Sequence, residues 1–284
     1  MKVTLVNPPT TSTLETITKL GLKVPPLGLA YIAATLEREG VNVTILDAVV
    51  ADISHKELGE VLQRTHPDVI GVTSTTPTIY DAIKTVMIAK ENCPDSVTVM
   101  GGSHITFTPL ETMLACPDLD VGVIGEGEAT ALDLIKSVEG RKPLSEVDGI
   151  VYRKDGNIFR NKPRRLIENL DELPFPARHL LPLKKYTVLG ERTLLGNIMT
   201  SRGCPYQCIF CSSSKFYGRR FRARSPNNVV DEMEELVTKY GIQSIEIVDD
   251  TFTVDKNRAA RIADEIIQRG LRIYWTCGSR ADLI

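Results

Sequence analysis

The sequence has 284 residues, of which 42% are hydrophobic and 25% are charged, and its formal net charge is −2. These values are typical of a folded globular protein, and they exclude a disordered chain or one that binds nucleic acid or acidic membranes through overall charge. No run of about 18 apolar residues is present, and the N-terminal apolar stretch is too short for a secretory signal. We therefore expect a cytoplasmic protein without a membrane span, built from about two domains.

Residues 1–140 have the pattern of an open α/β sheet. Short apolar strands alternate with amphipathic helices, and the strands are expected, in chain order, at 3–6, 41–46, 69–72, 97–100 and 121–124. Capping boxes at Ser54–Glu57 and Thr108–Glu111 predict where two of the helices begin. Because strands and helices alternate throughout, we expect a mostly parallel, doubly wound sheet.

Such sheets bind ligands beyond the carboxyl ends of their strands. The residues expected at those ends are Pro8, Pro9, Ser74, Thr75, Gly101, Gly102, Ser103, His104, Gly125, Glu126, Gly127 and Glu128. Glycine lets a backbone approach a flat ligand closely, and hydroxyls and amides can hold amide or phosphate groups. Taken alone, such glycines are more often turn residues, and His104 is more often a hydrogen-bonded loop residue than a ligand. The first strand is not followed by GxGxxG and no Walker loop is present, which excludes those nucleotide-binding fingerprints.

Residues 141–195 differ from the segments on either side. Gly149–Arg160 has the pattern of a β-hairpin with an Asp-Gly turn, and Leu170–Arg178 is a proline-rich, extended connector. We therefore expect a sheet domain over residues 1–140 and a linker with a small hairpin over residues 141–195.

Residues 196–284 predict a βαβαβ unit, the first part of a barrel with functional groups at its strand ends. Strands are expected at 197–200, 244–248 and 271–275, separated by helices at 225–240 and 256–269. A complete eight-stranded barrel takes ~250 residues. We therefore expect this stretch to be part of a longer protein.

Three of the six cysteines lie within eight residues, in the spacing Cys204-x3-Cys208-x2-Cys211. In a reducing compartment such clustering favours metal binding over disulfides, and thiolates suit iron–sulfur clusters and zinc. Structural zinc sites usually have four ligands in paired spacings, whereas Cys277 is the only other cysteine of this domain. The pattern therefore favours a [4Fe–4S] cluster held by three thiolates, with one iron left open.

The segment 200–211, Thr-Ser-Arg-Gly-Cys-Pro-Tyr-Gln-Cys-Ile-Phe-Cys, closely resembles the CxxxCxφC signature of the radical S-adenosylmethionine (radical SAM) superfamily. The resemblance implies a partial (β/α)6 barrel in which Cys204, Cys208 and Cys211 hold the cluster. The open iron would bind S-adenosylmethionine, and one electron would cleave it to a 5′-deoxyadenosyl radical.

The same resemblance implies residues that bind S-adenosylmethionine. Phe210 would pack near the adenine, and Asp249 or Asp250 would accept a hydrogen bond from the methionine amine. A common family form is glycine-rich at this second strand end, so the acidic pair departs from it, and stabilisation of a helix start is the alternative explanation. Arg280 would pair with the methionine carboxylate and Ser279 would reach the ribose.

The whole chain resembles the branch of this superfamily that carries an N-terminal cobalamin-binding domain. The matching stretches are Asn7–Pro9, Pro26–Ala30, Gly101–His104, Gly125–Glu128 and Leu173–Arg178. The resemblance implies a Rossmann-like (flavodoxin-like) domain with cobalamin on the strand ends named above. One departure concerns the DxHxxG loop that supplies a cobalt ligand in many cobalamin enzymes. Asp52, His55 and Gly59 have the wrong spacing for it, so we interpret His55 as a helix-start residue.

The resemblance implies radical C-methylation, with a ferredoxin or flavodoxin as electron donor and a small-molecule or peptide substrate. A radical cyclase or carbon-skeleton rearranging enzyme of the same architecture remains an alternative. A non-catalytic iron–sulfur electron-transfer or binding protein is an alternative of another class. A methylthiotransferase is disfavoured, because it would need three N-terminal cysteines where this chain has Cys93 and Cys116.

A basic run surrounds the cysteines and consists of Arg202, Lys215, Arg219, Arg220, Arg222 and Arg224. Interleaved aromatic residues make a nucleic-acid-binding patch one interpretation. A solvated loop that covers the cluster, or a site for an anionic small substrate, is the interpretation we favour.

Overall fold

The computed structural model describes residues 1–10, 23–188, 191–192 and 194–284. These residues form two compact units. The first unit contains residues 28–165 together with 1–10 and 176–182, and the second contains 23–27, 166–175 and the described residues from 183 onward. The segment 141–195, expected as a linker, is thus divided between the two units.

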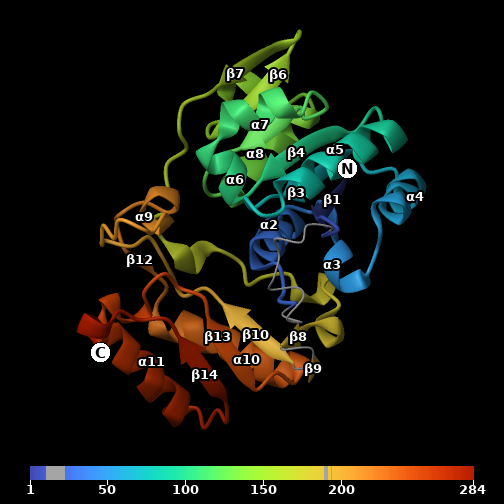
Figure 1. Ribbon diagram of the computed structural model, residues 1–284. Coiled ribbons are helices and arrows are strands. Elements are labelled where there is room, and N and C mark those ends of the chain that lie inside the picture. Colours follow the sequence, from blue (N-terminus) through green and yellow to red (C-terminus); the bar gives the residue numbers. More distant parts are fainter. Residues whose placement is uncertain (11–22, 189–190, 193) are drawn as a thin grey trace. The chain divides into compact units, whose positions relative to one another are not determined.

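The first unit is built on a seven-stranded sheet with the strand order β2-β1-β3-β4-β5-β6-β7 (Figure 1). The strands are β1 Lys2–Asn7, β2 Asn42–Asp47, β3 Val69–Thr73, β4 Val97–Gly101, β5 Val121–Val123, β6 Ile150–Lys154 and β7 Asn157–Arg160. Strands β1 to β5 are parallel, as predicted, and their order of 2-1-3-4-5 is that of flavodoxin-like sheets.

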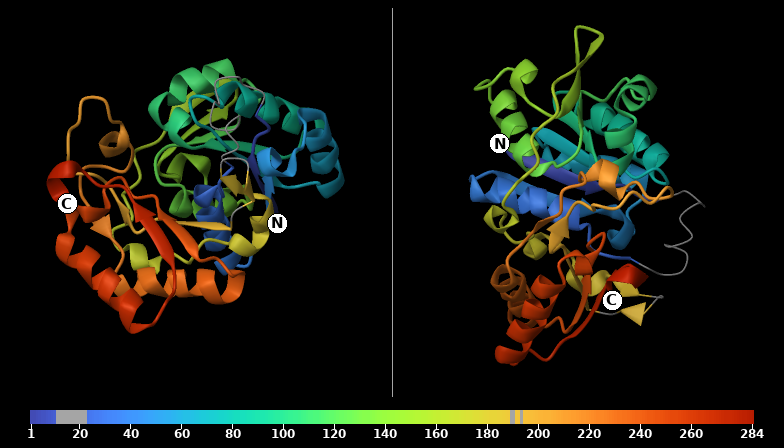
Figure 2. Two further views of the ribbon diagram at one scale, coloured as in Figure 1. Left: turned by 60° about the horizontal axis from the view of Figure 1, so that its bottom comes forward. Right: turned by 90° about the vertical axis from the view of Figure 1, so that its left-hand side faces the viewer.

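The predicted hairpin is strands β6 and β7, but it belongs to this sheet. Strand β6 pairs antiparallel with β5, and β7 pairs antiparallel with β6. Asp155 and Gly156 at the turn have φ values of 49° and 76°, as a type I′ turn requires. The hairpin extends the sheet at one edge and projects from it (Figures 1 and 2).

Helices connect strands β1 to β6 of the first unit. They are α2 Leu27–Arg38, α3 Ala48–Ala51, α4 His55–Thr65, α5 Ile79–Asn92, α6 Ser103–Phe107, α7 Pro109–Ala115 and α8 Glu128–Val138. One core cluster joins Leu58 of α4, Val86 of α5 and Met113 of α7 to Val72 and Met100 of the sheet. Burial of such side chains contributes about 25 cal/mol per Å² of apolar surface.

The two predicted capping boxes have different outcomes. In the first, the Ser54 side chain accepts from the backbone N–H of Glu57, and the Glu57 carboxylate accepts from the backbone N–H of Ser54, which confirms the prediction. In the second, helix α7 begins at Pro109 directly after Thr108, as predicted, but the Thr108 side chain makes no capping hydrogen bond. The Thr108 hydroxyl donates to the carbonyl oxygen of His104 at 2.9 Å, because the unpredicted helix α6 ends directly before Thr108 and its carbonyl groups need donors.

The second unit contains a parallel three-stranded sheet with the order β10-β13-β14 (Figure 1). Strand β10 is Leu195–Ile198, β13 is Ser244–Ile247 and β14 is Tyr274–Cys277. Helices α10 (Pro226–Tyr240) and α11 (Lys256–Gln268) connect them, which confirms the βαβαβ unit. Met233 and Ile262 of the helices pack with Ile198 and Ile247 of the strands in one core.

Strand β14 begins three residues later than expected. Gly270 has a φ of +63°, and the backbone N–H of Leu271 donates to the carbonyl oxygen of Ile266 at 3.1 Å. The residues that were expected to open the strand therefore still cap helix α11, and the strand starts only at Tyr274.

Short elements complete the described chain. They are the strands β8 Thr187–Val188, β9 Glu191–Arg192, β11 Ser201–Arg202 and β12 Arg222–Ala223, helix α9 Ser213–Phe216, and 3-10 turns at Leu144–Glu146, Leu170–Glu172, Arg178–Leu180, Leu183–Lys185, Phe252–Val254 and Ala281–Leu283. Among the described helices, none combines the length and apolar character needed to cross a bilayer.

Candidate functional site

The three clustered cysteines lie on one closed loop, residues 203–221, which we call the cysteine loop. Strand β11 precedes it, strand β12 follows it, and the two pair antiparallel, so the loop starts and ends at the same place. At Gly203 the φ is +86°, and a Cβ there would lie 2.2 Å from the carbonyl oxygen of Arg220. Only glycine can occupy this position without moving the backbone.

The cysteines differ in exposure within the loop. Cys204 is buried, Cys208 is half-buried and Cys211 is exposed. The Cys204 Sγ lies 3.9 Å from Thr251 Oγ1, and the Cys211 N–H donates to the carbonyl oxygen of Cys208 at 3.1 Å. Among the described residues, no three His, Cys, Asp or Glu side chains are gathered as they would be around a metal ion. The donor set of three thiols on one loop nevertheless suits an iron–sulfur cluster.

Phe210 and its neighbour Ile209 point into solvent. Their exposed fractions are 90% and 104%, respectively, although both side chains are large and apolar. Single exposed apolar residues are common, but this pair lies between the second and third cysteines. The position suits a side chain that would cover a bound ligand, as the sequence predicts for Phe210.

The two aspartates after strand β13 have opposite environments. Along this strand, Ile245 and Ile247 are buried, and Asp249 continues their alternation with an exposed fraction of 7%. Asp250 is exposed. The sequence pattern does not distinguish the two carboxylates, whereas the structure places one inside the protein and one at its surface.

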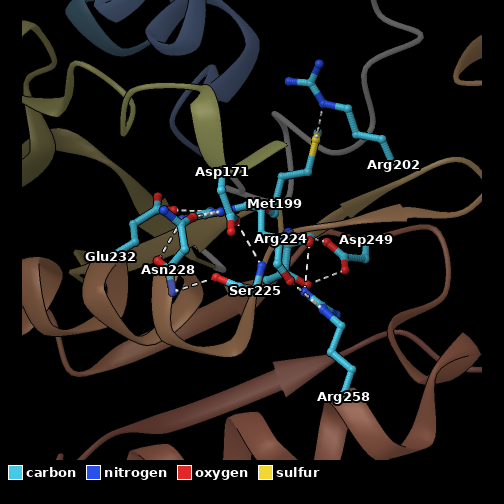
Figure 3. Close-up of polar contacts among 10 residues, drawn as sticks. Asp171, Met199, Arg202, Arg224, Ser225, Asn228, Glu232, Asp249 and Arg258 are labelled. Carbon is cyan, nitrogen blue, oxygen red and sulfur yellow. Dashed lines mark hydrogen bonds and ion pairs between the residues drawn. The ribbon is translucent and has the colours of Figure 1, made fainter. Parts of the chain in front are cut away.

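Asp249 accepts three hydrogen bonds from the chain just before the cysteine loop. Figure 3 shows its carboxylate among the polar contacts of this region. Its Oδ1 accepts from the backbone N–H of Thr200 at 2.6 Å, and its Oδ2 accepts from the hydroxyls of Thr200 and Ser201 at 2.5 and 2.6 Å. Burial raises the pKa of the Asp249 carboxyl, and these hydrogen bonds oppose the effect. Both oxygens are therefore engaged inside the protein.

Arg280 links the end of strand β14 to the cysteine loop. Its Nη1 donates to the Cys208 Sγ at 3.2 Å, and its guanidinium lies 4.1 Å from the centre of the Tyr206 ring. The Asp282 carboxylate accepts from its Nε and Nη2 at 3.0 and 3.1 Å. The Ser279 hydroxyl bonds to that of Thr253. The sequence predicted Arg280 and Ser279 as binding residues but missed Asp282 and Tyr206. Only the Arg-x-Asp spacing could have indicated Asp282.

Half of the basic run lies in the interior of the protein. Arg202, Arg222 and Arg224 are each 4% exposed, and Arg222 donates to the carbonyl oxygens of Ile167 and Tyr217 at 2.6 and 3.0 Å. The exposed members of the run are Lys215, Arg219 and Arg220. Half of the run thus lies inside the protein, which differs from the solvated loop that the favoured interpretation expected, and this half is not presented to a nucleic acid.

The second set of predicted residues lies at the carboxyl edge of the first sheet, because strands β1 to β5 are parallel. At Gly102 the φ is +101°, and a Cβ would lie 2.4 Å from the carbonyl oxygen of Ser74. The Ser74 N–H and hydroxyl donate to the Gly101 carbonyl at 2.8 and 2.9 Å, and the His104 N–H donates to the Ser74 carbonyl at 3.2 Å. Strands β3 and β4 are thus joined tightly beyond their ends.

The other predicted residues of this edge vary in exposure. Thr75 is exposed, Gly101, Ser103, His104, Gly125 and Gly127 are half-buried, and Pro8, Pro9, Glu126 and Glu128 are buried. The His104 Nδ1 lies 3.2 Å from Thr76 Oγ1, and burial lowers the pKa of His104. The Gly125 N–H donates to Thr106 Oγ1 at 3.1 Å.

His55 is the first residue of helix α4. Its side chain is 6% exposed, and its Nε2 is 3.4 Å from the carbonyl oxygen of Asp81 on helix α5. The interpretation of His55 as a helix-start residue is confirmed. A buried ring between two helices is not available to a cofactor on the strand ends.

Two family models match the chain. The radical SAM superfamily matches residues 198–282, which include the cysteine loop, and the B12 binding domain matches residues 16–135. The chain belongs to the radical SAM superfamily. In this radical SAM protein the B12-binding domain comes first, as the sequence resemblance implied.

The radical SAM protein has curated relatives with two kinds of name. It is 42% identical over 282 residues to the uncharacterized methyltransferase PH0819 of Pyrococcus horikoshii, with 99% of this chain and 60% of the relative covered. It is 35% identical over 263 residues to an anaerobic magnesium-protoporphyrin IX monomethyl ester cyclase of Rubrivivax gelatinosus, with 90% and 47% covered. The chain thus spans about half the length of the curated relatives it matches.

Solved structures share the fold. OxsB, a cobalamin-dependent radical enzyme, has a TM-score of 0.80 at 24% identity, with 99% of this chain and 39% of that chain covered. TsrM of Kitasatospora setae, a radical SAM methyltransferase solved with cobalamin and a [4Fe–4S] cluster, has a TM-score of 0.74 at 22% identity, with 94% and 51% covered. These likenesses show the α/β fold, a B12-binding domain followed by a radical SAM domain.

Proposed function

We propose that this chain is the cofactor-binding part of a radical SAM enzyme, and that the enzyme is a cobalamin-dependent C-methyltransferase. The cysteine loop carries the proposal. It presents Cys204, Cys208 and Cys211 on one closed loop beyond the first strand of a βαβαβ unit, in a chain that also has a B12-binding domain. The name of the 42% identical relative supports methyl transfer in particular.

The three thiolates would hold a [4Fe–4S] cluster and leave one iron for S-adenosylmethionine. When bound, the cluster would supply the electron that cleaves S-adenosylmethionine to a 5′-deoxyadenosyl radical, and cobalamin would supply the transferred methyl group. The task of the chain is to bind and orient both groups and to exclude water from the radical.

Four exposed or accessible side chains near the cysteine loop would bind S-adenosylmethionine. Phe210 would cover the adenine, Asp250 would accept from the methionine amine, and Ser279 would reach the ribose. Arg280 already holds the Asp282 carboxylate through two nitrogens, which is the geometry that a methionine carboxylate requires. The cosubstrate would therefore compete with Asp282 for Arg280. We assign Asp249 a different task below.

Cobalamin would lie on the carboxyl edge of the first sheet. The residues proposed there are Pro8, Pro9, Ser74, Thr75, Gly101, Gly102, Ser103, His104, Gly125, Glu126, Gly127 and Glu128. Ser74 is joined tightly to Gly101 and Gly102, so this part of the edge has a fixed backbone on which a ligand could lie. Because His55 is buried against Asp81, the cobalt would lack a histidine ligand from a DxHxxG loop. A visible spectrum of anaerobically purified protein tests this part.

One assay separates the enzyme from a non-catalytic iron–sulfur protein. Reconstituted protein that receives dithionite and S-adenosylmethionine should release 5′-deoxyadenosine. A carrier or electron-transfer protein would release none. A Cys208→Ala variant, which lacks one proposed ligand, provides the control and should release none either.

A radical cyclase is the second candidate, because one relative with that name is 35% identical. S-adenosylmethionine labelled in its methyl group distinguishes the two. A methyltransferase transfers the label to its product, whereas a cyclase gives an unlabelled product.

An electron donor and a location complete the proposal. We expect a ferredoxin or flavodoxin as reductant, since the cluster would need one electron for each cleavage. The six cysteines are free thiols, which suits the reducing cytoplasm.

A further inference from the structure

A buried polar network lies at the base of the cysteine loop, where strands β11 and β12 pair (Figure 3). Asp249 binds three donors of Thr200 and Ser201, at distances of 2.5 to 2.6 Å. These two residues directly precede Arg202 and the loop. A carboxylate that accepts hydrogen bonds from two hydroxyls and a backbone N–H fixes both the position and the direction of the chain at Thr200 and Ser201.

Two arginines, Arg224 and Arg258, bind the carbonyl oxygen of Thr200. The carbonyl oxygen of Thr200 accepts from Arg258 Nη2 at 2.8 Å and from the backbone N–H of Arg224 at 2.9 Å. The Arg258 Nε also donates to the carbonyl oxygen of Arg224 at 2.8 Å. Because Arg224 follows strand β12, Arg258 joins the entrance of the loop to its exit.

The network balances its charges inside the protein. Arg224 forms an ion pair with Glu232 of helix α10, and its Nε donates to Asn228 Oδ1 at 2.6 Å. Arg258 is 3% exposed and Glu232 is fully buried. Two buried cations thus accompany the two carboxylates of Glu232 and Asp249. Removal of the Glu232 carboxylate would leave the buried Arg224 without its ion-pair partner, which is costly. Removal of the Asp249 carboxylate would leave the donors of Thr200 and Ser201 without their acceptor.

We propose that Asp249 is a positioning residue of the cluster site, which fixes the base of the cysteine loop before iron arrives, while Asp250 binds S-adenosylmethionine. The inference rests on the proposed function and deepens it. Thr251, two residues after Asp249, lies 3.9 Å from the buried Cys204 Sγ, so the same segment also contacts the first ligand. A base that is already ordered reduces the conformational entropy that cluster binding must overcome.

The test compares Asp249→Asn and Asp249→Ala with Asp250→Asn in the full chain. Each apoprotein is reconstituted with limiting iron and sulfide, and iron and sulfide per chain are measured. The EPR spectrum of the reduced cluster is recorded with and without S-adenosylmethionine. We expect both Asp249 variants to bind iron about 10-fold more weakly or worse, as is usual when support of a metal ligand is lost. Their spectra without S-adenosylmethionine should be heterogeneous.

Asp250→Asn should keep the cluster content and the spectrum of the wild type, and lose only the spectral change that S-adenosylmethionine causes. The inference would be overturned if an Asp249 variant kept the cluster content and spectrum of the wild type and lost only the spectral change that S-adenosylmethionine causes. If the wild type itself binds no cluster, the proposed function fails, and this outcome is distinct from the failure of the inference.

A milder set of variants covers the case in which the Asp249 variants do not fold, as judged by circular dichroism. Thr200→Val and Ser201→Ala each remove one hydroxyl donor and leave the carboxylate and its cations in place. We expect a graded loss of iron content, larger in the double variant than in either single variant. Wild-type iron content and spectrum in the double variant would contradict the assigned role.

Discussion

Gly102 shows how strongly one residue can be constrained at a strand end. Its φ is +101°, and a Cβ added to it would lie 2.4 Å from the Ser74 carbonyl oxygen and 2.9 Å from the Ser74 nitrogen. The neighbouring atoms belong to the backbone and cannot move aside easily. The sequence predicted a functional or turn glycine here, but only the structure shows that the reason is close contact between strands β3 and β4.

Gly102→Ala should therefore destabilise the first unit by about 2 kcal/mol or more, the combined cost of strain and steric contact. Urea unfolding measures the change. Gly28→Ala is the matched control, since Gly28 lies in helix α2 with no atom within 4 Å of an added Cβ. That variant should be neutral or slightly more stable. Equal losses in both variants would contradict the steric explanation.

Arg280 gives a second prediction for a single residue. Its Nη1 donates to the Cys208 Sγ at 3.2 Å, and hydrogen bonds to the sulfur ligands of a cluster raise its reduction potential. We expect Arg280→Gln to lower the midpoint potential of the reconstituted cluster, by an amount on the order of tens of millivolts. Arg272→Gln, which changes an exposed arginine just before the same strand, serves as the control. An unchanged potential in Arg280→Gln would show that the contact does not act on the cluster.

The sequence could identify the three cysteines, but it could not assign different roles to Asp249 and Asp250. Both carboxylates follow the same apolar strand, and the strand pattern ends before them. Asp249 is buried and Asp250 is exposed because the alternation of buried and exposed side chains continues past the end of the strand. Asp249 also binds Thr200 and Ser201, which are about 50 residues away in the chain. Contacts of this kind depend on tertiary structure.

Helix α10 supports the base of the cysteine loop, because its Glu232 forms an ion pair with Arg224, which follows strand β12. Glu232→Ala should destabilise the second unit by about 3 kcal/mol or more, because the buried guanidinium of Arg224 would lose its countercharge. Glu235→Ala on the same helix removes a partly exposed pair with Lys239 and should cost about 0.5 kcal/mol or less. Thermal unfolding of both variants measures the difference. Similar effects would argue against the buried pair as a structural requirement.

The contact between helices α4 and α5 makes stability depend on pH. Burial lowers the pKa of His55, although its bond to the Asp81 carbonyl opposes this. The unfolded chain therefore binds the proton at a higher pH than the folded chain does. Below about pH 6.5, the ordinary pKa of histidine, the unfolded chain holds more protons and stability falls as pH decreases.

His55→Gln should lessen this loss of stability between about pH 7.5 and pH 5.5, as measured by urea unfolding. His66→Gln, which changes an exposed histidine at the other end of helix α4, should leave the loss as it is in the wild type. If both variants have the pH profile of the wild type, His55 is not responsible for the dependence.

Most elements were predictable because hydrophobic periodicity and caps are local signals. The parallel strands, the first capping box and the hairpin turn followed from a few adjacent residues each. The joining of the hairpin to β5, the helix α6 and the late start of β14 did not. These features depend on which strands pair and on particular backbone hydrogen bonds, and hydrophobic periodicity gives no information about either.

At the scale of the whole molecule, two units with separate cores carry two sets of strand-end residues. One sheet offers a closely joined carboxyl edge, and the other unit offers a closed loop with three thiols. A radical methyl transfer would need both, because one cofactor generates the radical and the other delivers the methyl group. The chain covers 60% of its 42% identical relative, so the substrate and the full activity remain part of the proposal.

The most direct test of this account is the cluster itself. Anaerobically reconstituted wild-type protein should contain close to four irons and four sulfides per chain, with the Mössbauer spectrum of a [4Fe–4S] cluster. The EPR spectrum of its reduced form should change when S-adenosylmethionine is added. Zinc in the cysteine loop, or an absence of iron and sulfide from otherwise folded protein, would contradict the central claim.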